Sequence, residues 1–423
     1  MRLLWLTNKV IPPVEKVAYG SSQNVGGGWL DNIFSQLCEN DNVEMYIICC
    51  GGRVQKTGDS SSFSWTIIKG SLAIEEKYSS SLCDLFKNII NNFQPDLIHV
   101  WGTEFPHSLA LINAASELNL LDKTIVSVQG LISFISKHYT LGIPIKYLKK
   151  NTFSDYFLGS SVLRQQESFY NRGLYEEEAL RKTKHVIGRT FWDHSCVKII
   201  NPSLDYYKCN ETLRDEFYTD KWDYNHCQKH SIFVSQASYP VKGFHLLLNA
   251  LPLIIKNFPD TQVYVAGGDP TNTTSLKSRL LLSGYGLYLK RLIQTHHLQD
   301  RIHFLGNLDS SRMKEQYLKC NVFISCSTIE NSPNSVGEAM LLGCPIVSSD
   351  VGGVRSLLID GKEGLTYAAD EYYIIPPLVS RIFDDQQLAV TLGENARKHA
   401  AITHDPEKNY SDLLAIYNRV LEK

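Results

Sequence analysis

Short apolar runs alternate with segments of helical periodicity along the whole chain, and this alternation restricts the fold more than any other feature. Six runs lie in the first half, at residues 2–8, 43–50, 64–70, 96–102, 124–130 and 184–190. Six more lie in the second half, at residues 231–236, 261–268, 301–306, 321–327, 345–350 and 363–368. Most runs are apolar on both faces, which is typical of parallel strands covered by helices on both sides. The sequence therefore predicts an α/β fold with two Rossmann-like, doubly wound domains.

The boundary between these domains is expected near residues 201–230, which lack a clean period and are rich in Tyr, Asp and Asn. We predict an N-terminal domain over residues 1–205, a connection over residues 206–230 and a C-terminal domain over residues 231–423. A helix at the carboxyl terminus could pack back on the first domain. The carboxyl ends of the strands of both domains can then face one central cleft, the usual ligand position in open α/β sheets.

The charge balance excludes one large class of partner. Forty-two Lys and Arg residues stand against 44 Asp and Glu residues, which leaves a net charge of -2, and no long block of one sign occurs. We therefore expect no nucleic-acid partner. No stretch approaches the ~18 apolar residues of a membrane-spanning helix, and the first apolar run is too short for a signal peptide. These features predict a cytoplasmic protein.

A long insertion, residues 131–185, separates two predicted strands of the first domain. Residues 137–150 (KHYTLGIPIKYLKK) combine four lysines with tyrosines and aliphatic side chains. This mixture could bind peripherally to an anionic membrane surface or to a lipid-linked acceptor. The alternative is a solvated helix with an apolar inner stripe, and we favour this alternative on the sequence alone.

The most informative segment is residues 327–353, STIENSPNSVGEAMLLGCPIVSSDVGG. Ser332 and Pro333 have the pattern of an N-cap followed by the first residue of a helix. The first turn would present free N–H groups at Asn334 and Ser335 together with the positive helix end. We expect this helix end to bind a diphosphate.

Two carboxylates bracket that predicted diphosphate site. Glu338 lies about a turn and a half into the helix, and its side chain leans back toward the N-terminus, at a distance that suits a ribose. Glu330 lies in the preceding loop and would face the group attached to the other phosphate. Each Glu alone could be an ordinary surface residue, but the turn at Gly352–Gly353, which permits close backbone approach, favours a site. The pattern indicates a nucleotide-sugar site.

A second motif, residues 233–251, joins a predicted strand to an apolar helix. Lys242 stands at the start of this helix, so its ammonium group would lie beside a helix N-terminus, where it could stabilise a leaving diphosphate. For Lys242 alone, a solvated surface lysine would be the simpler interpretation.

Three glycines, Gly26, Gly27 and Gly28, lead into a helix whose inner face is apolar. They could approach a ligand or only form a tight turn, and the sequence favours neither alternative. No G-x-G-x-x-G follows the first strand, which argues against a dinucleotide cofactor.

These motifs resemble those of the retaining glycosyltransferases of family 4, which have the two-domain GT-B fold. The family signature is E-x7-E followed by EAM-x-x-G-x-P-x-V and a GG loop, and this chain has Glu330, Glu338, EAMLLGCPIV and Gly352–Gly353. The resemblance implies that Glu330 contacts the donor sugar and Glu338 the ribose of the nucleotide. It also implies that Lys242 contacts the leaving diphosphate.

The chain departs from the family pattern at several positions. The Arg that usually accompanies the Lys is replaced by Gln236, which we predict to be substrate-binding in its place. The family often has His where this chain has Gln129 and Trp101, so the resemblance supports no role for a histidine near the sugar. Gly26 and Gly27 match a glycine pair that the family places against donor phosphates or acceptor.

No D-x-D motif occurs, which argues against a diphosphate clamped by Mg²⁺, so we expect neither metal nor cofactor. The resemblance implies a retaining transferase that moves a hexose-type sugar from a nucleotide diphosphate sugar, most plausibly a UDP-sugar, to a glycan or lipid-linked acceptor in bacterial surface polysaccharide biosynthesis. The alternatives are a nucleotide-sugar epimerase of the same fold and a non-catalytic sugar-nucleotide-binding partner of another transferase.

Overall fold

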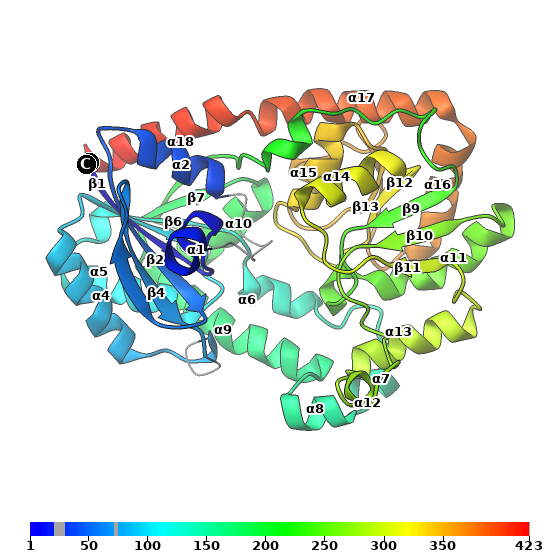
Figure 1. Cartoon of the computed structure of the whole chain (residues 1–423), viewed down its shortest axis with the longest axis horizontal. Helices are drawn as coiled ribbons and strands as arrows, with labels where there is room; N and C mark the ends of the chain where they lie inside the picture. Colours follow the sequence, from blue (N-terminus) through cyan, green and yellow to red (C-terminus); the bar gives the residue numbers. More distant parts are fainter. Residues whose placement is uncertain (21–29, 72–74, 423) are drawn as a thin grey trace. The chain divides into compact units, whose positions relative to one another are not determined.

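The computed structural model describes residues 1–20, 30–71 and 75–422, which fold into two compact units that each contain one open sheet (Figure 1). The first unit consists of residues 1–134, 168–214 and 404–423. The second unit consists of residues 135–167 and 215–403.

The described residues of the first unit form an eight-stranded sheet in the order β3-β4-β2-β1-β5-β6-β7-β8. Neighbouring strands are parallel except for β3 and β4, which pair antiparallel at one edge. The strands are β1 (Arg2–Thr7), β2 (Glu44–Gly52), β3 (Lys56–Asp59), β4 (Phe63–Lys69), β5 (Leu97–Trp101), β6 (Thr124–Ser127), β7 (His185–Gly188) and β8 (Asp205–Lys208).

Helices cover both faces of this sheet because alternate side chains of its central strands are apolar on both sides. In β1, Leu4 and Leu6 belong to one hydrophobic cluster and Leu3 and Trp5 to another. The helices are α1 (Pro12–Tyr19), α2 (Asp31–Glu39), α4 (Ser80–Phe93), α5 (Pro106–Glu117), α10 (Phe191–Ile200), α18 (Pro406–Leu421) and the part of α9 (Val162–Lys182) from Ser168 onward.

The carboxyl-terminal helix α18 packs on the first sheet through a buried polar contact. The indole N–H of Trp5 donates to the hydroxyl oxygen of Tyr417 at 3.2 Å, and that hydroxyl lies 2.6 Å from Nδ1 of His99. His99 on β5 is fully buried, and its Nε2 lies 2.7 Å from the Ser127 hydroxyl. His99 is therefore a core residue of this unit.

The described residues of the second unit form a six-stranded parallel sheet in the order β11-β10-β9-β12-β13-β14. The strands are β9 (Ser231–Val234), β10 (Gln262–Val265), β11 (Ile302–Phe304), β12 (Val322–Ser325), β13 (Ile346–Ser349) and β14 (Leu365–Tyr367). The helices are α7 (Ile145–Leu148), α8 (Phe153–Leu158), α11 (Phe244–Asn257), α12 (Leu276–Leu280), α13 (Gly284–Thr295), α14 (Ser310–Lys319), α15 (Asn334–Leu342), α16 (Ile375–Asp384) and α17 (Gln386–Thr403).

Short helical turns complete the fold. Helix α6 (Ile132–Ile135) crosses the boundary between the units, and six 3₁₀ turns occur in the described residues. The turns are η1 (Leu121–Lys123), η2 (Ser136–His138), η3 (Asp215–Tyr218), η4 (Pro240–Lys242), η5 (Val354–Ser356) and η6 (Tyr372–Ile374). Within the described part of the chain, no helix is both long enough and apolar enough to span a bilayer.

All twelve predicted strands are present, with ends that differ by a few residues, and two further strands, β3 and β8, were not predicted. Both lie at sheet edges and are largely exposed, so they lack the apolar pattern of the central strands. The predicted domain end at residue 205 falls inside the first unit's strand β8, and that unit continues to Arg214. Residues 215–230, predicted as connection, belong to the second unit, where Phe217 and Trp222 are buried.

Residues 135–167 differ from the prediction most clearly, because they group with the second unit rather than with the predicted N-terminal domain. Tyr139 and Ile143 are buried, and the ring of Tyr147 lies 4.5 Å from that of Tyr288 on α13. The single helix favoured by the sequence is absent, because the segment contains only η2 and the four-residue α7, and its buried side is formed by these contacts. They join segments more than a hundred residues apart, which local periodicity cannot reveal.

Candidate functional site

The strand order of the second unit creates a switch point at β9. The chain passes from β9 to β10 on one side, whereas β12 lies on the other side of β9. The segments that follow β9 and β12 therefore meet at the carboxyl edge of the sheet, where open α/β sheets bind ligands. The turn η4 and helix α11 follow β9, and the loop to α15 follows β12. This edge contains most of the site residues predicted from the sequence.

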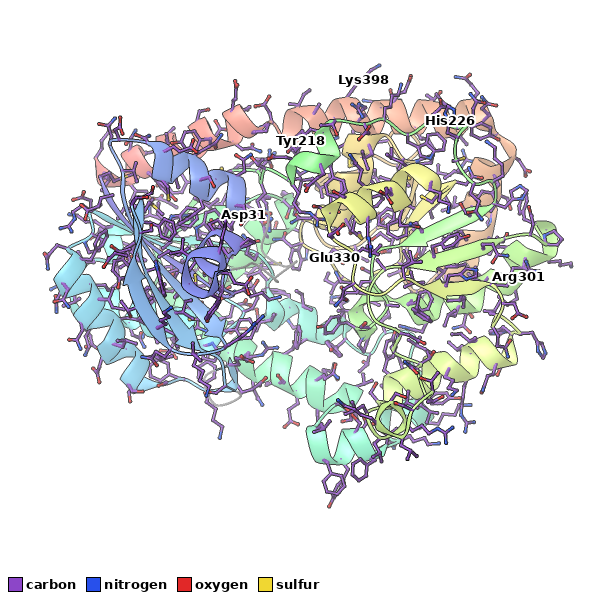
Figure 2. All side chains as sticks on the ribbon, in the orientation of Figure 1. Asp31, Tyr218, His226, Arg301, Glu330 and Lys398 are labelled. Carbon is purple, nitrogen blue, oxygen red and sulfur yellow. The ribbon has the colours of Figure 1, made fainter. Side chains whose placement is uncertain are left out.

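Lys242 and Glu330 form an ion pair at this edge. The Lys242 ammonium nitrogen lies 2.5 Å from Oε1 of Glu330, and the Ser327 hydroxyl donates to the same oxygen at 2.7 Å. Only 14% of the Glu330 side chain and 31% of the Lys242 side chain are exposed. Figure 2 labels Glu330 in the loop that follows β12. Among the described residues, no hydrogen bond reaches the second carboxylate oxygen, Oε2, of Glu330.

A close backbone contact positions Lys242. Gly243 has φ 65°, and a Cβ at this position would lie 1.8 Å from the carbonyl oxygen of Cys326 at the end of β12. The Thr328 N–H donates to the carbonyl oxygen of Val241 at 2.7 Å. The turn η4 can therefore lie directly on the loop after β12 only because residue 243 is glycine.

The glycine pair at Gly352–Gly353 positions the backbone of Glu330. The Gly353 N–H donates to the Glu330 carbonyl oxygen at 3.0 Å. Gly352 has φ 50°, and a Cβ there would lie 2.0 Å from the same oxygen. The predicted close approach at this turn is therefore to the site loop itself.

Helix α15 begins one residue later than predicted. Pro333 is the N-cap, with ψ 112° and no side-chain cap, and Asn334 is the first helical residue. The N–H groups of Val336 and Gly337 donate to the Pro333 carbonyl, so those of Asn334 and Ser335 have no intrahelical acceptor. The helix end thus keeps donors and a positive dipole, which could hold an anion.

Glu338 lies in the second turn of α15 and is buried. The hydroxyl oxygen of Tyr317 on α14 lies 3.2 Å from Oε2 of Glu338 and 3.1 Å from the Ser335 carbonyl oxygen, and its one proton is shared between these two acceptors. Tyr317 thus ties the Glu338 carboxylate to the first turn of its own helix. Nothing in the sequence indicated Tyr317, because it lies 21 residues before Glu338.

The remaining predicted residues are less informative. Gln236 follows β9 and is half-buried, and it forms no hydrogen bond with a described residue. Gly26 and Gly27 lie outside the described residues. The sequence analysis did not single out Ser327 as a site residue. Its only sequence signal is its position three residues before Glu330. Within the described residues, no cluster of three or more His, Cys, Asp or Glu side chains could hold a metal ion.

The first unit has its own polar groups at the carboxyl edge of its sheet, near the switch point at β1. The Asn8 amide donates to Oε2 of Glu104 at 2.6 Å, and its oxygen lies 2.7 Å from Nε2 of His107. Burial lowers the pKa of His107 to about 3, so the ring is neutral. A pocket of about 300 Å³ at this edge is lined by Asn8, Lys9, Glu75, Phe105 and His107.

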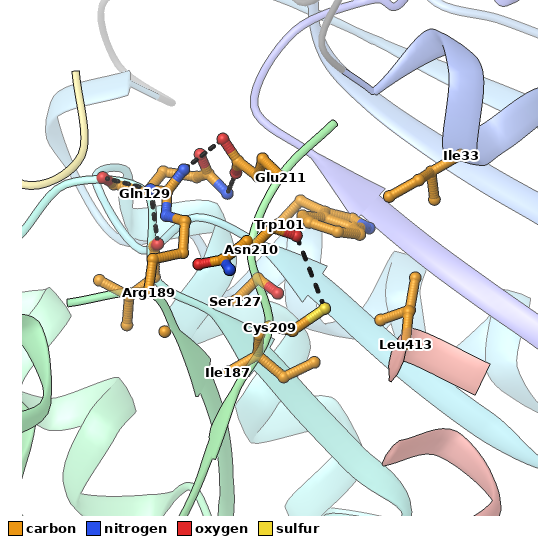
Figure 3. Close-up of a pocket in the computed structure, with 12 residues that line it drawn as sticks. Ile33, Trp101, Ser127, Gln129, Ile187, Arg189, Cys209, Asn210, Glu211 and Leu413 are labelled. Carbon is orange, nitrogen blue, oxygen red and sulfur yellow. Dashed lines mark hydrogen bonds and ion pairs between the residues drawn. The ribbon is translucent and has the colours of Figure 1, made fainter. Parts of the chain in front are cut away.

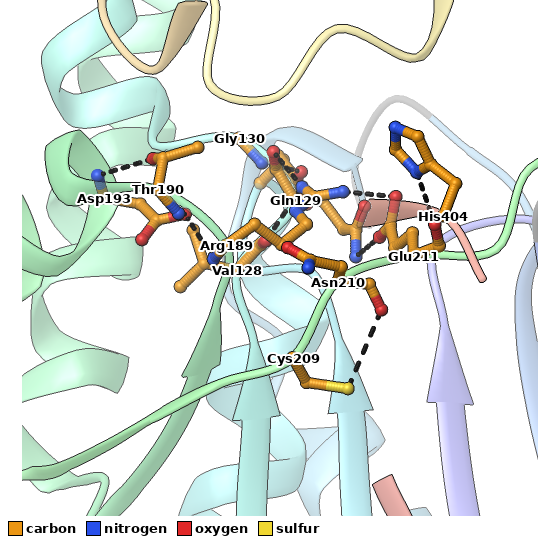
Figure 4. Close-up of polar contacts among 11 residues, drawn as sticks. Val128, Gln129, Gly130, Arg189, Thr190, Asp193, Cys209, Asn210, Glu211 and His404 are labelled. Atoms are coloured by element: carbon orange, nitrogen blue, oxygen red, sulfur yellow. Dashed lines mark hydrogen bonds and ion pairs between the residues drawn. The ribbon is translucent and has the colours of Figure 1, made fainter. Parts of the chain in front are cut away.

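A second polar cluster lies at the ends of β6, β7 and β8 and surrounds a pocket with room for only about 10 Å³ (Figure 3). Arg189 pairs with the Glu211 carboxylate, and the Gln129 amide donates to the other Glu211 oxygen at 2.8 Å. Nδ1 of His404 lies 2.7 Å from the Glu211 carbonyl oxygen (Figure 4). Burial raises the pKa of Glu211, and Arg189 opposes this shift. Gln129 is thus held by Glu211.

Residues 216–399 match the family described as glycosyl transferases group 1. The chain is 30% identical over 133 residues to the lipopolysaccharide core biosynthesis mannosyltransferase LpcC of Rhizobium leguminosarum bv. viciae, which is 31% of this chain and 37% of the relative. It is 22% identical over 182 residues to the capsular polysaccharide biosynthesis glycosyltransferase CapM of Staphylococcus aureus, which is 43% of this chain and 44% of the relative. The chain thus spans less than half the length of these two relatives. Part of the chain is thus similar to glycosyltransferases.

Solved structures resemble the whole chain. Sucrose-phosphate synthase from Thermosynechococcus elongatus has a TM-score of 0.71 at 16% identity and covers 100% of this chain and 99% of its own. HepE from Anabaena, solved in complex with UDP-glucose, has a TM-score of 0.66 at 16% identity and covers 99% of this chain and 100% of its own. These likenesses confirm the predicted fold class.

Proposed function

We propose that this chain is a retaining glycosyltransferase that moves a hexose-type sugar from a nucleotide diphosphate sugar, a UDP-sugar in the first instance, to a glycan or lipid-linked glycan in surface polysaccharide biosynthesis. We place the reaction in the cytoplasm, where such donors are made. The observation that carries the proposal is the Lys242–Glu330 ion pair, in which Glu330 lies in the loop leading to the open first turn of α15, with Glu338 in the second turn of that helix.

The donor diphosphate is assigned to the second unit. Its negative charge is matched by the Lys242 ammonium group and by the free N–H groups of Asn334 and Ser335. The diphosphate then competes with Glu330 for Lys242, and no metal or cofactor enters the proposal. Gln236, at the end of β9, supplies an uncharged donor where the related family usually has Arg.

The two carboxylates have different targets in this proposal. Glu338 accepts hydrogen bonds from the ribose hydroxyls, and Tyr317 holds it in position. Glu330 accepts hydrogen bonds from the donor sugar through Oε2, while Ser327 holds Oε1. Carboxylates suit this task because they accept strong hydrogen bonds from sugar hydroxyl groups.

The transfer step forms a bond between the acceptor oxygen and the anomeric carbon and breaks the bond between that carbon and the phosphate oxygen. The acceptor proton passes to the leaving phosphate oxygen on the same face of the sugar, so the anomeric configuration is retained. Lys242 and the α15 dipole stabilise the charge that develops on the diphosphate. No protein base is needed, and the loss of a histidine at Gln129 is therefore compatible with turnover.

The acceptor is assigned to the pocket at the β1 switch point of the first unit. Its volume of about 300 Å³ is at the lower end of small-molecule sites, and its lining combines an aromatic ring, Phe105, with the polar groups of Asn8, Lys9 and Glu75. An aromatic face beside hydrogen-bonding groups matches the apolar faces and hydroxyl edges of a sugar. A glycan end is the chemistry that fits.

A product assay tests this function. The purified chain is incubated with single nucleotide diphosphate sugars, with and without a lipopolysaccharide-core or capsular oligosaccharide, and the free nucleotide and the product are identified by mass spectrometry and NMR. We expect nucleotide diphosphate release that depends on acceptor, and a product with the anomeric configuration of the donor. A donor sugar that changes configuration without acceptor would favour an epimerase. Nucleotide-sugar binding without turnover would favour a non-catalytic partner, and an inverted product would exclude the retaining mechanism.

A further inference from the structure

Helix α8 (Phe153–Leu158) of the second unit exposes its apolar side chains. Phe153, Tyr156, Phe157 and Leu158 are between 54% and 68% exposed. The rings of Phe153 and Phe157 lie 4.4 Å apart, and those of Tyr156 and Phe157 lie 5.1 Å apart. The ring of Phe157 thus contacts both other rings, and the exposed Leu158 follows them at the end of the helix.

Polar contacts hold α8 in this orientation. The buried Asp155 forms a capping box with Thr152, and its carboxylate accepts the N–H of Gly284 at 2.9 Å and the hydroxyl of Ser160 at 2.8 Å. An isolated six-residue helix is unstable in water, so these contacts maintain it. Amphipathic helices of globular proteins bury their apolar face, whereas α8 buries its carboxylate and presents its apolar residues to solvent.

The surroundings of α8 are basic. Between residues 145 and 164 the basic residues are Lys146, Lys149, Lys150 and Arg164, and the only acidic residue is the buried Asp155. The segment from residue 276 to 291, which contains α12 and the start of α13, has four basic residues and no acidic one. It adds exposed leucines at Leu276, Leu280 and Leu281. The whole chain has a net charge of -2, so this local excess of positive charge is not a general property of its surface.

We propose that the surface formed by Phe153, Tyr156, Phe157 and Leu158 with Lys146, Lys149 and Lys150, here called the α8 surface, binds the anionic face of a lipid bilayer. Aromatic and leucine side chains enter the boundary between headgroups and acyl chains, while flanking lysines contact anionic phosphates. Protein–protein interfaces are depleted in lysine, so the lysines beside the aromatic residues favour a membrane over a protein partner. This surface shares Lys146, Lys149 and Lys150 with the predicted membrane segment, but its apolar residues come from α8, because Tyr139 and Ile143 of that segment are buried.

The test is a flotation assay on the whole chain without nucleotide, so its outcome is independent of the proposed transferase activity. We expect binding to vesicles of equal parts phosphatidylglycerol and phosphatidylcholine at low salt, and little binding to phosphatidylcholine alone. The variant Phe153→Ser/Tyr156→Ser/Phe157→Ser should bind at least about tenfold more weakly. The variant Lys146→Gln/Lys149→Gln/Lys150→Gln should lose about 100-fold and most of the salt dependence.

A matched control is Tyr373→Ser/Ile402→Ser, which removes two apolar side chains of the same unit that are 53% and 69% exposed and lie outside the α8 surface. This control should bind vesicles like the wild type, and all variants should keep the wild-type circular dichroism spectrum, because every substituted side chain is at least half exposed or a surface lysine. The proposal is wrong if the wild type does not bind anionic vesicles, if it binds both vesicle types equally, or if the serine variant binds normally. If the wild type does not bind vesicles but self-associates, and the serine variant does not self-associate, the α8 surface binds a second copy of the chain instead.

Discussion

The ammonium nitrogen of Lys242 lies 2.5 Å from Oε1 of Glu330, although the two residues are 88 positions apart in the sequence. Strand β9 pairs with β12, and this pairing brings the turn after β9 onto the loop after β12. The Glu330 side chain is the less exposed of the two, and Lys242 compensates its charge. When a diphosphate binds Lys242, phosphate oxygens replace Oε1 of Glu330 as partners of the ammonium group. Glu330 is then able to contact another group.

Lys242→Ala should weaken the binding of a nucleotide diphosphate about 30-fold, because a charge-assisted hydrogen bond is worth about 2 kcal/mol. Isothermal titration calorimetry with UDP and then with other nucleotide diphosphates measures the effect. The exposed Lys256, on the helix α11 that follows η4, serves as the matched control, and Lys256→Ala should bind like the wild type. Unchanged affinity in Lys242→Ala would remove Lys242 from the diphosphate site.

Glu330→Gln and Glu338→Gln should separate the two carboxylate roles. Glu330→Gln should leave the affinity for the free nucleotide diphosphate nearly unchanged and lower kcat by about 10²-fold, the pattern of a contact that matters mainly in the transition state. Glu338→Gln should weaken the binding of the free nucleotide diphosphate, because Glu338 contacts the ribose in the proposed complex. Glu315→Gln, an exposed residue on α14, is the control. If Glu330→Gln loses nucleotide affinity as severely as Glu338→Gln, the sugar does not lie at Glu330.

Gly352→Ala should lower turnover as well as stability. A methyl group there would meet the Glu330 carbonyl oxygen, so the loop that carries the carboxylate has to move. Gly361→Ala is a matched control, because Gly361 also has a positive φ, of 68°, but an added Cβ there would have no atom within 4 Å. Thermal unfolding should show a loss of about 1 kcal/mol for Gly361→Ala from backbone strain alone, with kcat retained. Equal kcat in the two variants would contradict a role for Gly352 in positioning Glu330.

Chelation should leave the activity unchanged. Lys242 and the backbone N–H groups of α15 supply the positive charge in the proposed mechanism, so EDTA-treated enzyme should keep its kcat. The measurement compares initial rates before and after EDTA, with Mg²⁺ or Mn²⁺ added back. Loss of turnover that either metal restores would refute the metal-independent mechanism.

The free energy of unfolding should decrease as the pH falls, and part of this decrease should depend on His245. This histidine is fully buried, with Nε2 2.8 Å from the Leu141 carbonyl oxygen and Nδ1 3.1 Å from the Tyr285 hydroxyl. Burial lowers its pKa from 6.5 to about 4. Between these two pH values the imidazole of His245 binds a proton in the unfolded chain but not in the folded chain. The contribution of His245 to the free energy of unfolding is therefore complete above pH 6.5 and is lost as the pH falls toward 4.

Denaturant unfolding at several pH values measures this effect. His245→Asn should reduce the pH slope of the unfolding free energy by up to about 1.4 kcal/mol per pH unit in this range. An identical slope in wild type and His245→Asn would show that His245 does not titrate between the two states as described.

Local pattern was enough to predict most strands of the sheets and the placement of several candidate site residues in the second unit. Most of the twelve predicted strands are buried on both faces, and burial is what produces an apolar run. The positions of Glu330 and Glu338 relative to a helix start could also be predicted, because capping signals and helical spacing act within a few residues. The exact helix start shifted by one residue, since Pro333 adopts an extended ψ.

Tertiary structure alone decided which distant residues meet. The Lys242–Glu330 pair, the Tyr317 contact to Glu338 and the Arg189–Glu211 pair join residues between 21 and 88 positions apart, and these contacts follow from strand order and helix packing. The placement of residues 135–167 with the second unit depends on contacts such as Asp155 with Gly284, 129 positions apart. Such contacts depend on the free energy of the whole folded chain, to which all elements contribute together. Periodicity and spacing report on a residue's immediate neighbours, so they predicted the elements but not which elements would meet.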